Sequence, residues 1–254
     1  DRGLGVYFFS FFNSILSVRM ATILCIETST DVCSVALCRD GIMLSLRELS
    51  EGYLHAEKLL PFILEVINEA GLAKKDIQAV AVSSGPGSYT GLRIGVSTAK
   101  GLCYALDIPL ISVSTLQALA WKLKQDLPVK KTKETEPVLF CPMIDARRME
   151  VYTALYDVNL TEVMKITAEV MDEKAFSDYF EKYTIYFTGD GAEKCKPLFA
   201  EQKKADFKLQ SPASAFAMCE LAEMAYQHGN FENLALFEPF YLKDYKAGKS
   251  SPLN

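Results

Sequence analysis

The chain has 254 residues, of which 50% are hydrophobic, and it carries a formal net charge of −5 at pH 7. This length and apolar content suffice for one large domain or two modest ones. A protein that binds nucleic acid without a partner usually has more basic than acidic residues. The negative net charge therefore argues against independent binding of a polynucleotide. The seven cysteines form no CxxC pair, and several lie in apolar runs, which argues against a disulfide framework and for a reducing compartment.

Residues 1–19 differ from everything after them. They hold an apolar run that is interrupted by polar residues, is short for a bilayer span and lacks a small-residue cleavage site. Met20 follows, and a strand-like run begins at Thr22. We therefore expect residues 1–19 to be an extension outside the fold, and the remainder to be a cytoplasmic protein without membrane contact.

From Thr22 onward, short apolar runs and turn signals alternate with one amphipathic stretch. The predicted elements are strands at 22–27, 32–38 and 42–48, a helix from about 59 to 70, a buried strand at 78–83, a helix ending near 107 and a strand at 110–113. An Asp-Gly turn joins the second and third strands, and Gly71 marks the end of the first helix. The order is β-β-β-α-β-α-β, which predicts an α/β unit.

The second half of the chain repeats the first. Ile26-Glu27 and Ala36-Leu37 reappear at one constant offset as Ile144-Asp145 and Ala154-Leu155. Two copies of such a unit are the plan of the actin-like fold (ASKHA, a duplicated RNase H-like unit) with two subdomains. We predict the subdomains at 20–117 and 118–254, with residues 124–137, charged and containing two prolines, near the boundary as an exposed connection.

Folds of this plan hold a nucleotide in the cleft between their halves, with hairpin turns near the phosphates. Here those turns are 27–30 and 145–148, and each half also has a glycine corner after a strand. The candidate nucleotide or anion contacts are Glu27, Thr28, Ser29, Gly85, Gly87, Ser88, Gly189 and Gly191. The alternative interpretation is that these residues only form turns.

Residues 83–102, SSGPGSYTGLRIGVSTAKGL, place five glycines at one strand–helix junction. The stretch matches neither a Walker A loop, nor the dinucleotide-binding fingerprint, nor the hydrolase elbow. On a helical wheel, one face collects Gly91, Ile94, Gly95, Thr98 and Leu102. Small residues allow a second helix to approach closely, and that helix is either the one at 59–70 or one of another molecule. We expect both, and packing within the chain alone remains the alternative.

No complete catalytic constellation can be assembled from the residues. A metal pair at i, i+4 would need a second histidine one turn after His55, and position 59 is Leu. We therefore predict neither catalytic residues nor metal ligands. The alternative is a phosphotransferase acting on a small metabolite, which would need a carboxylate base and a tight ATP cleft. A protease is disfavoured because both a metal pair and a nucleophile frame are missing.

Five blocks of the sequence together resemble the TsaB (YeaZ) family. They are ILCIETST at 23–30, HAEKLLP at 55–61, the glycine stretch at 83–102, VSTLQALA at 113–120 and MIDARRMEVYTALY at 143–156. The resemblance runs from about Met20 to Leu242, and GPGSYTGLRIG is highly specific. This family is the accessory subunit of the bacterial system that installs threonylcarbamoyl on the adenosine 3′ of the anticodon in tRNAs reading ANN codons.

The resemblance implies an actin-like fold without catalytic competence of its own. The larger paralogue (TsaD-like) carries an HxxxH metal pair on the helix equivalent to His55–Leu59 and transfers the threonylcarbamoyl group from an adenylate to tRNA. The implied partners are this paralogue, a small P-loop ATPase (TsaE-like) and a second copy of the chain, with tRNA met only through the complex. Weak ATP or ADP binding is the most that is implied for this subunit, since metal and ATP belong to its partners. Glu27 stands where Asp is more usual.

The resemblance also implies that pairing uses the first two helices. The predicted interface residues are His55, Leu59, Phe62, Ile63, Gly91, Ile94, Gly95, Thr98 and Leu102. From the small-residue face, we expect Gly95→Leu to block pairing while leaving the fold intact.

Overall fold

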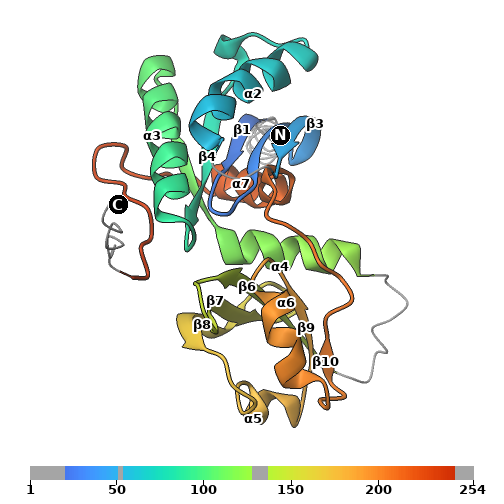
Figure 1. Cartoon of the computed structure of the whole chain (residues 1–254). Helices are drawn as coiled ribbons and strands as arrows, with labels where there is room; N and C mark the ends of the chain where they lie inside the picture. Colours follow the sequence, from blue (N-terminus) through green and yellow to red (C-terminus); the bar gives the residue numbers. More distant parts are fainter. Residues whose placement is uncertain (1–20, 51–53, 128–136, 244–254) are drawn as a thin grey trace, which may run out of the picture.

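Two mixed five-stranded sheets lie one above the other, with a helix between them (Figure 1). The computed structural model describes residues 21–50, 54–127 and 137–243. The predicted extension at 1–19 and most of the predicted connection at 124–137 lie outside the described residues.

The N-terminal sheet has the strand order β3-β2-β1-β4-β5. Its strands are β1 (Thr22–Glu27), β2 (Cys33–Arg39), β3 (Ile42–Leu49), β4 (Ala79–Gly85) and β5 (Leu110–Ser114). The first three strands form an antiparallel meander, whereas β4 and β5 run parallel to β1. Every residue of β1 is buried, because helices cover both faces of the sheet at this position.

The second sheet repeats this topology with the order β10-β9-β6-β7-β8. Its strands are β6 (Val138–Asp145), β7 (Glu150–Tyr156), β8 (Glu162–Val170), β9 (Thr184–Thr188) and β10 (Ala205–Asp206). Again the first three are antiparallel, and the last two run parallel to the central strand. The repeated order confirms the predicted duplication and the two-subdomain actin-like fold.

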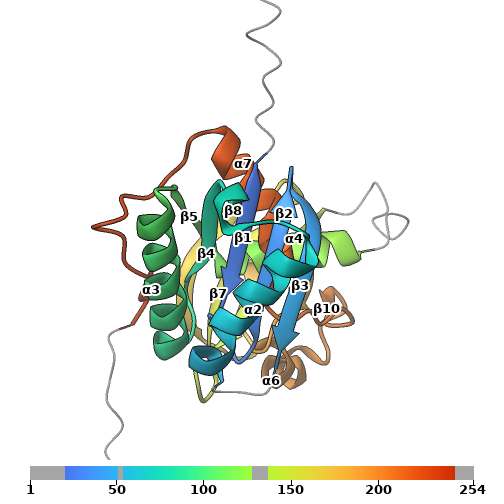
Figure 2. The ribbon, with the colours of Figure 1, turned by 90° about the horizontal axis from the view of Figure 1, so that it is seen from above.

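Two long helices cover one face of the N-terminal sheet, as Figure 2 shows: α2 (His55–Glu69) lies over the β2–β3 side and α3 (Tyr89–Leu106) over β4. A short 3-10 turn, η1 (Lys74–Asp76), leads from α2 towards β4. Each helix buries one apolar stripe against the strands. The stripe of α2 includes Leu59, Ile63 and Val66, and that of α3 includes Leu92, Val96, Ala99 and Cys103.

The helix α4 (Thr115–Asp126) lies between the two sheets. The side chain of Ser114 caps its N-terminus by accepting a hydrogen bond from the Gln117 amide at 3.4 Å. Leu119 and Leu123 pack on the second sheet, while Trp121 belongs to the core of the first. The boundary between the subdomains therefore runs through this helix.

The last part of the chain returns to the N-terminal sheet. The turn η3 (Ala215–Met218) and the helix α7 (Cys219–Gln227) cover the face opposite α2 and α3. Further on, the Phe240 amide donates a hydrogen bond to the Ser84 carbonyl at 2.7 Å. The predicted C-terminal subdomain at 118–254 is therefore wrong in its last part, because this face of the first sheet is as apolar as the other and also needs a cover.

Short helices cover the outer face of the second sheet: α5 (Ser177–Phe180), α6 (Ala192–Cys195) and η2 (Lys196–Phe199). Beneath them, a cluster of phenylalanines packs around Phe187, whose ring stacks on Phe207 at 4.4 Å between centroids. In the part of the chain that the structure describes, no helix combines the length and apolar character of a membrane span.

Candidate functional site

A cleft of about 1270 Å³ opens between the two subdomains. The first half lines it with the β1–β2 turn and the start of α3, the second half with the β6–β7 turn and Asp190, and residues 240–243 close one side. The acidic residues that line the cleft are Asp31, Asp145, Glu150 and Asp190. The basic residues that line it are Arg147, Arg148 and Lys243.

The β1–β2 turn is built around the buried carboxylate of Glu27. Its Oε1 accepts a hydrogen bond from the Ser29 amide at 2.6 Å. Burial raises the pKa of Glu27, and hydrogen bonds from Ser29 and Ser83 partly oppose the rise. Glu27 lies beneath the turn and outside the cleft lining, so its direct role is to shape the turn.

The glycines of the strand–helix junction bring α3 against this turn. A Cβ atom at Gly91 would lie 2.0 Å from the Thr28 carbonyl oxygen, and one at Gly95 would lie 2.3 Å from Thr28 Oγ1. Thr28 Oγ1 in turn donates a hydrogen bond to the Gly91 carbonyl at 2.8 Å. The prediction that Gly91 and Gly95 face a partner is therefore wrong, because the same chain covers them.

The expected anion site at the start of α3 is partly occupied by the chain itself. The Ser88 amide donates to the Ser29 carbonyl at 2.6 Å, and Ser88 Oγ accepts from the Gly91 amide at 3.3 Å. A Cβ atom at Gly87 would lie 2.3 Å from the Ser29 carbonyl oxygen. Ser29, Gly87 and Ser88 do line the cleft, as predicted contacts should.

The other predicted contacts lie outside the cleft lining: Glu27, Thr28, Gly85, Gly189 and Gly191. Gly85 has a φ of +107°, and a Cβ there would lie 2.7 Å from the Phe240 carbonyl oxygen. Gly189 likewise has a φ of +96° and packs against Met143 of β6. Gly85 and Gly189 are needed because the backbone is left-handed and closely packed at both positions. Their structural role is therefore to form turns.

The carboxylates of the second half form a small network. Asp145 Oδ1 accepts from the Arg147 amide at 2.6 Å and from Lys194 Nζ at 2.7 Å. Asp190 Oδ1 accepts from the Asp145 amide at 2.9 Å. Burial raises the pKa of Asp190, and repulsion from Asp145 and from Asp31 of the other half adds to the rise. Among the described residues, no three of these carboxylates converge on one point as metal ligands would.

His55 and Leu59 are both buried by their own chain. His55 Nε2 lies 2.9 Å from the Thr30 carbonyl oxygen and 3.3 Å from that of Val32, so it donates and fastens the turn. Leu59, 1% exposed, and Ile63, 3% exposed, belong to the core beneath α2. The prediction that His55, Leu59 and Ile63 lie at a partner interface is therefore wrong, because the core stripe of an amphipathic helix points towards its own sheet.

What α2 and α3 do expose is a different apolar stripe. Leu60 and Leu64, one turn apart on α2, are 56% and 46% exposed. Ile94, Thr98 and Leu102 follow one another along α3 and are half-buried. We call these five residues the helix-pair surface.

Phe62 lies on the other side of α2. It shares a stripe with Glu65 and Glu69, whose carboxylates bind Arg47 of β3 at 2.9 and 2.6 Å. It is half-buried against the core.

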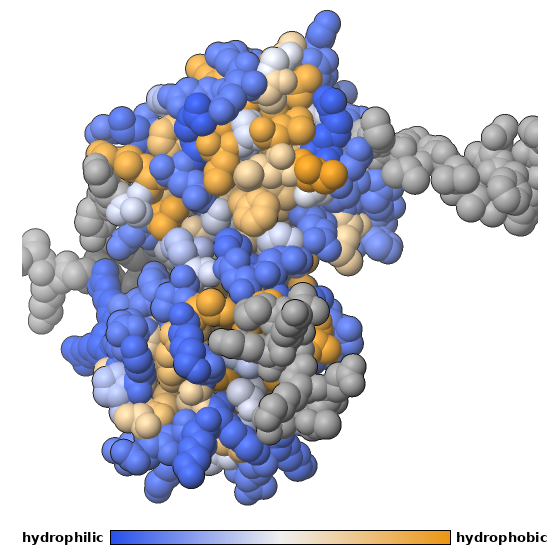
Figure 3. Space-filling view, turned by 90° about the vertical axis from the view of Figure 1, so that its right-hand side faces the viewer, coloured by the Kyte–Doolittle hydropathy of each residue, from blue (hydrophilic) through white to orange (hydrophobic). Residues whose placement is uncertain are grey.

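The view from the β3 side shows apolar side chains gathered over the N-terminal subdomain (Figure 3), and β3 itself exposes Ile42 and Leu44.

Leu60 and Leu64 were not among the interface residues predicted from the sequence. The available signal was that two leucines four residues apart lie off the stripe that Leu59, Ile63 and Val66 define.

The fold and the cleft define the class of protein, which is a two-subdomain α/β protein of the actin-like type. Residues 52–250 match the family model described as TsaD, tRNA N6-adenosine threonylcarbamoyltransferase.

The relatives identify the particular family. The TsaB protein of Escherichia coli, described as a tRNA threonylcarbamoyladenosine biosynthesis protein, is 39% identical over 243 residues, 91% of this chain and 98% of its own length. That of Haemophilus influenzae is 28% identical over 243 residues, 91% of this chain and 97% of its own. The solved structure of YeaZ from Pseudomonas aeruginosa has a TM-score of 0.70 and 27% identity and covers 88% of this chain and 100% of its own. This chain belongs to the TsaB (YeaZ) family.

Proposed function

We propose that the chain is a non-catalytic subunit for threonylcarbamoyl transfer to the adenosine 3′ of the anticodon in ANN-decoding tRNAs. It acts by pairing with a larger, metal-bearing catalytic paralogue. Its part in tRNA threonylcarbamoyladenosine biosynthesis follows from the family. The observation that carries the pairing is the helix-pair surface: two leucines of α2 stay exposed, and α2 contacts α3, whose Ile94 and Leu102 are half-buried.

The assignment of catalysis to the paralogue is supported by the helix that would carry the metal pair. Leu59 fills the second ligand position and is buried in the core. His55, at the first position, uses Nε2 to hold the Thr30 carbonyl. Neither side chain is arranged to bind a metal ion in the cleft.

We assign ATP and metal to the partner subunits, including a small P-loop ATPase, and at most weak ATP or ADP binding to this cleft. The amides of Ser88 and Gly91 are engaged within the chain, which supports this assignment.

The same surface suits a second copy of the chain, so we propose that self-association and pairing with the paralogue compete. Transfer RNA is reached only through the complex, in keeping with a net charge of −5.

The test is the double variant Leu60→Glu/Leu64→Glu. Full burial of one leucine stabilises an interface by about 1.5–3 kcal/mol, and Leu60 and Leu64 are already about half buried, so we expect the loss of both to weaken binding to the paralogue by about 10- to 100-fold. Binding is measured by calorimetry with the purified paralogue, and self-association by sedimentation.

Val170→Glu serves as the matched control, since Val170 is 68% exposed but lies on β8 of the other subdomain. It should bind like the unmodified chain. A double variant that is folded and binds the paralogue with unchanged affinity would refute this placement of the interface.

A further inference from the structure

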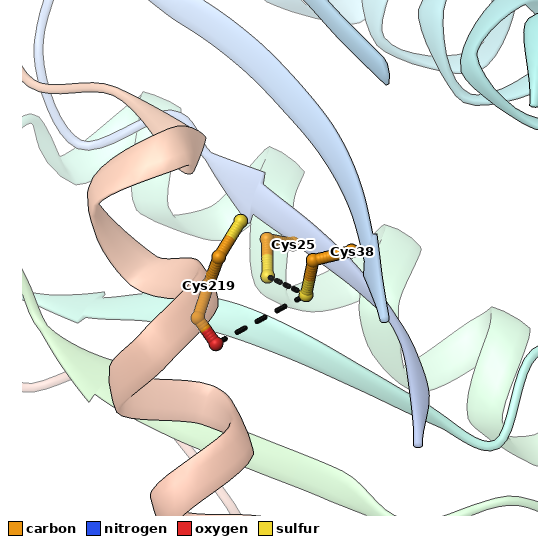
Figure 4. A group of neighbouring side chains, drawn as sticks. All are labelled: Cys25, Cys38 and Cys219. Atoms are coloured by element: carbon orange, nitrogen blue, oxygen red, sulfur yellow. Dashed lines mark hydrogen bonds between the residues drawn. The ribbon is translucent and has the colours of Figure 1, made fainter. Parts of the chain in front are cut away.

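Three cysteines from distant parts of the sequence meet in the core of the N-terminal subdomain. Cys25 lies on β1, Cys38 on β2 and Cys219 at the start of α7, and Figure 4 shows the helix cysteine beside the pair on the strands. All three are between 0% and 1% exposed. They are the only group of potential metal ligands that comes together within the described residues.

Their spacing is close to that of three sulfur ligands around one atom. The Sγ atoms of Cys25 and Cys38 are 4.0 Å apart, and all three Sγ atoms lie within 4.8 Å of one another. With bonds of about 2.3 Å to a central atom, as in zinc thiolates, three sulfurs in a plane are separated by about 4.0 Å, and three around a pyramidal centre that carries a lone pair by about 3.5 Å. The thiols therefore need to move by less than about 1 Å to share one atom.

The thiols lie within an apolar cluster of the core. Their neighbours in the cluster include Ile23, Ala217 and Ala222. Cys38 Sγ donates to the Ile23 carbonyl at 3.5 Å, so it is held as a neutral thiol. Hydrogen bonds with Cys219, and then burial, raise the pKa values of Cys25 and Cys38, whereas the same contacts lower the pKa of Cys219 to about 5.

Two acidic groups, Glu223 and Asp40, lie close to this cluster. Glu223 of α7 has its pKa raised first by burial and then by repulsion from Asp40 and Cys38. An ion that leaves net negative charge on the three sulfurs would therefore be disfavoured here. Three thiolates around Zn²⁺ carry one negative charge and around Cu⁺ two, whereas a trivalent centre leaves none.

We propose that Cys25, Cys38 and Cys219 form a binding site for a trivalent thiophile, of which arsenite is the simplest. Arsenous acid, As(OH)₃, reacts with three thiols to give As(SR)₃ and three molecules of water. Three As–S bonds form while three As–O and three S–H bonds break, and each thiol proton leaves in water. The oxidation states of arsenic and sulfur do not change, so no oxidant or reductant is needed.

Such a site would fasten the returning helix to the sheet that it covers. Cys38 and Cys219 are 181 positions apart in the sequence, so a bridging atom joins the end of the fold to its beginning. A ligand that binds only this arrangement stabilises the folded state and lowers amide exchange in α7. The three thiols are buried, so the ligand can reach them only when α7 moves away from the sheet. We therefore expect slow binding and slow release.

The experiment titrates arsenite into the full chain, reduced with a phosphine in place of a thiol. We expect one arsenic per chain, a mass increase of one arsenic less three hydrogens, a higher melting temperature and slower exchange in α7. X-ray absorption at the arsenic edge should show three sulfur neighbours and no oxygen. Parallel titrations with Zn²⁺ and Cu⁺ should show weaker binding.

Cys219→Ala should weaken arsenite binding by at least about tenfold, because only two thiols remain. Cys195→Ala is the matched control, since Cys195 is buried in the other subdomain and should leave binding unchanged. Should Cys219→Ala fail to fold, the X-ray absorption of the unmodified chain decides. Oxygen in the arsenic shell, tighter binding of Zn²⁺ or Cu⁺, or unchanged arsenite affinity in Cys219→Ala would overturn the proposal.

Discussion

Gly95 shows at the scale of single residues why the strand–helix junction is rich in glycine. Inside a helix, Gly→Ala normally stabilises by roughly 0.5–1 kcal/mol. At Gly95 the added Cβ would lie 2.3 Å from Thr28 Oγ1, so we predict that Gly95→Ala destabilises by about 1–3 kcal/mol. For the same reason Gly95→Leu would disturb the fold as well as any complex. Chemical denaturation measures the change.

Two further variants distinguish the effect of the close contact between residue 95 and Thr28 from the effect of helix propensity. Thr28→Ala removes the opposing oxygen, so Gly95→Ala should cost less in that background than in the unmodified chain. Gly101→Ala, where an added Cβ meets nothing within 4 Å, should stabilise. Equal effects of Gly95→Ala in both backgrounds would contradict this explanation.

Burial of Glu27 makes the stability of the folded state depend on pH, and it also sets the sign of that dependence. Since burial raises its pKa in the folded state above the reference value of 4.5, the folded state binds the proton more tightly than the unfolded state. This residue therefore lowers stability as the pH rises from about 4.5 through the folded pKa. We predict that Glu27→Gln is more stable than the unmodified chain at pH 7 and that the difference shrinks towards pH 4.

Denaturant midpoints across that pH range check the prediction. A difference that grows as the pH falls would show that the carboxylate is stabilised in the folded state, contrary to the structure.

At the scale of elements, Glu48 of β3 joins the first sheet to the returning C-terminal segment. Its Oε1 accepts hydrogen bonds from the hydroxyls of Ser34 on β2, at 2.8 Å, and Ser214 before η3. Ser34 Oγ also accepts from the Ala215 amide at 2.9 Å. The start of η3 is thus held to two strands through one carboxylate.

We predict that Glu48→Ala destabilises by about 1–3 kcal/mol, because two buried hydroxyls lose their acceptor. Amide exchange should rise in η3 and α7 more than in α2. Glu48→Gln, which keeps one acceptor oxygen, should have a smaller effect. Unchanged exchange in η3 and α7 would contradict the role assigned to this residue.

The elements themselves were predictable to different degrees. The order of elements along the first half of the chain and the duplication could be read from apolar runs and from the repeated Ile26 and Ile144 pattern, because strand periodicity and turn residues are local. The return of α7 could not, since its docking depends on the second apolar face of a sheet formed far earlier in the chain. Leu59 and Ile63 were assigned to the wrong side for a related reason: a single helix does not reveal which of its apolar positions its own sheet covers.

At the scale of the whole molecule, two similar halves enclose a cleft, while the helix-pair surface lies on one half. The cleft was predictable from the duplication, and Ser29, Gly87 and Ser88 were placed in it correctly. The meeting of Cys25, Cys38 and Cys219 was not predictable, because their positions carry no metal-binding spacing and only the fold brings them together. On the proposed function, a chain that has the buried Leu59 in place of the second metal ligand acts through a larger partner.

Threonylcarbamoyl transfer to tRNA, reconstituted from purified components, tests this role most directly. We predict that the chain alone transfers nothing, that it supports transfer when the metal-bearing paralogue and the P-loop ATPase are added, and that Leu60→Glu/Leu64→Glu removes this support while Val170→Glu keeps it. Transfer by the chain alone, or full support by the double variant, would contradict the proposed function.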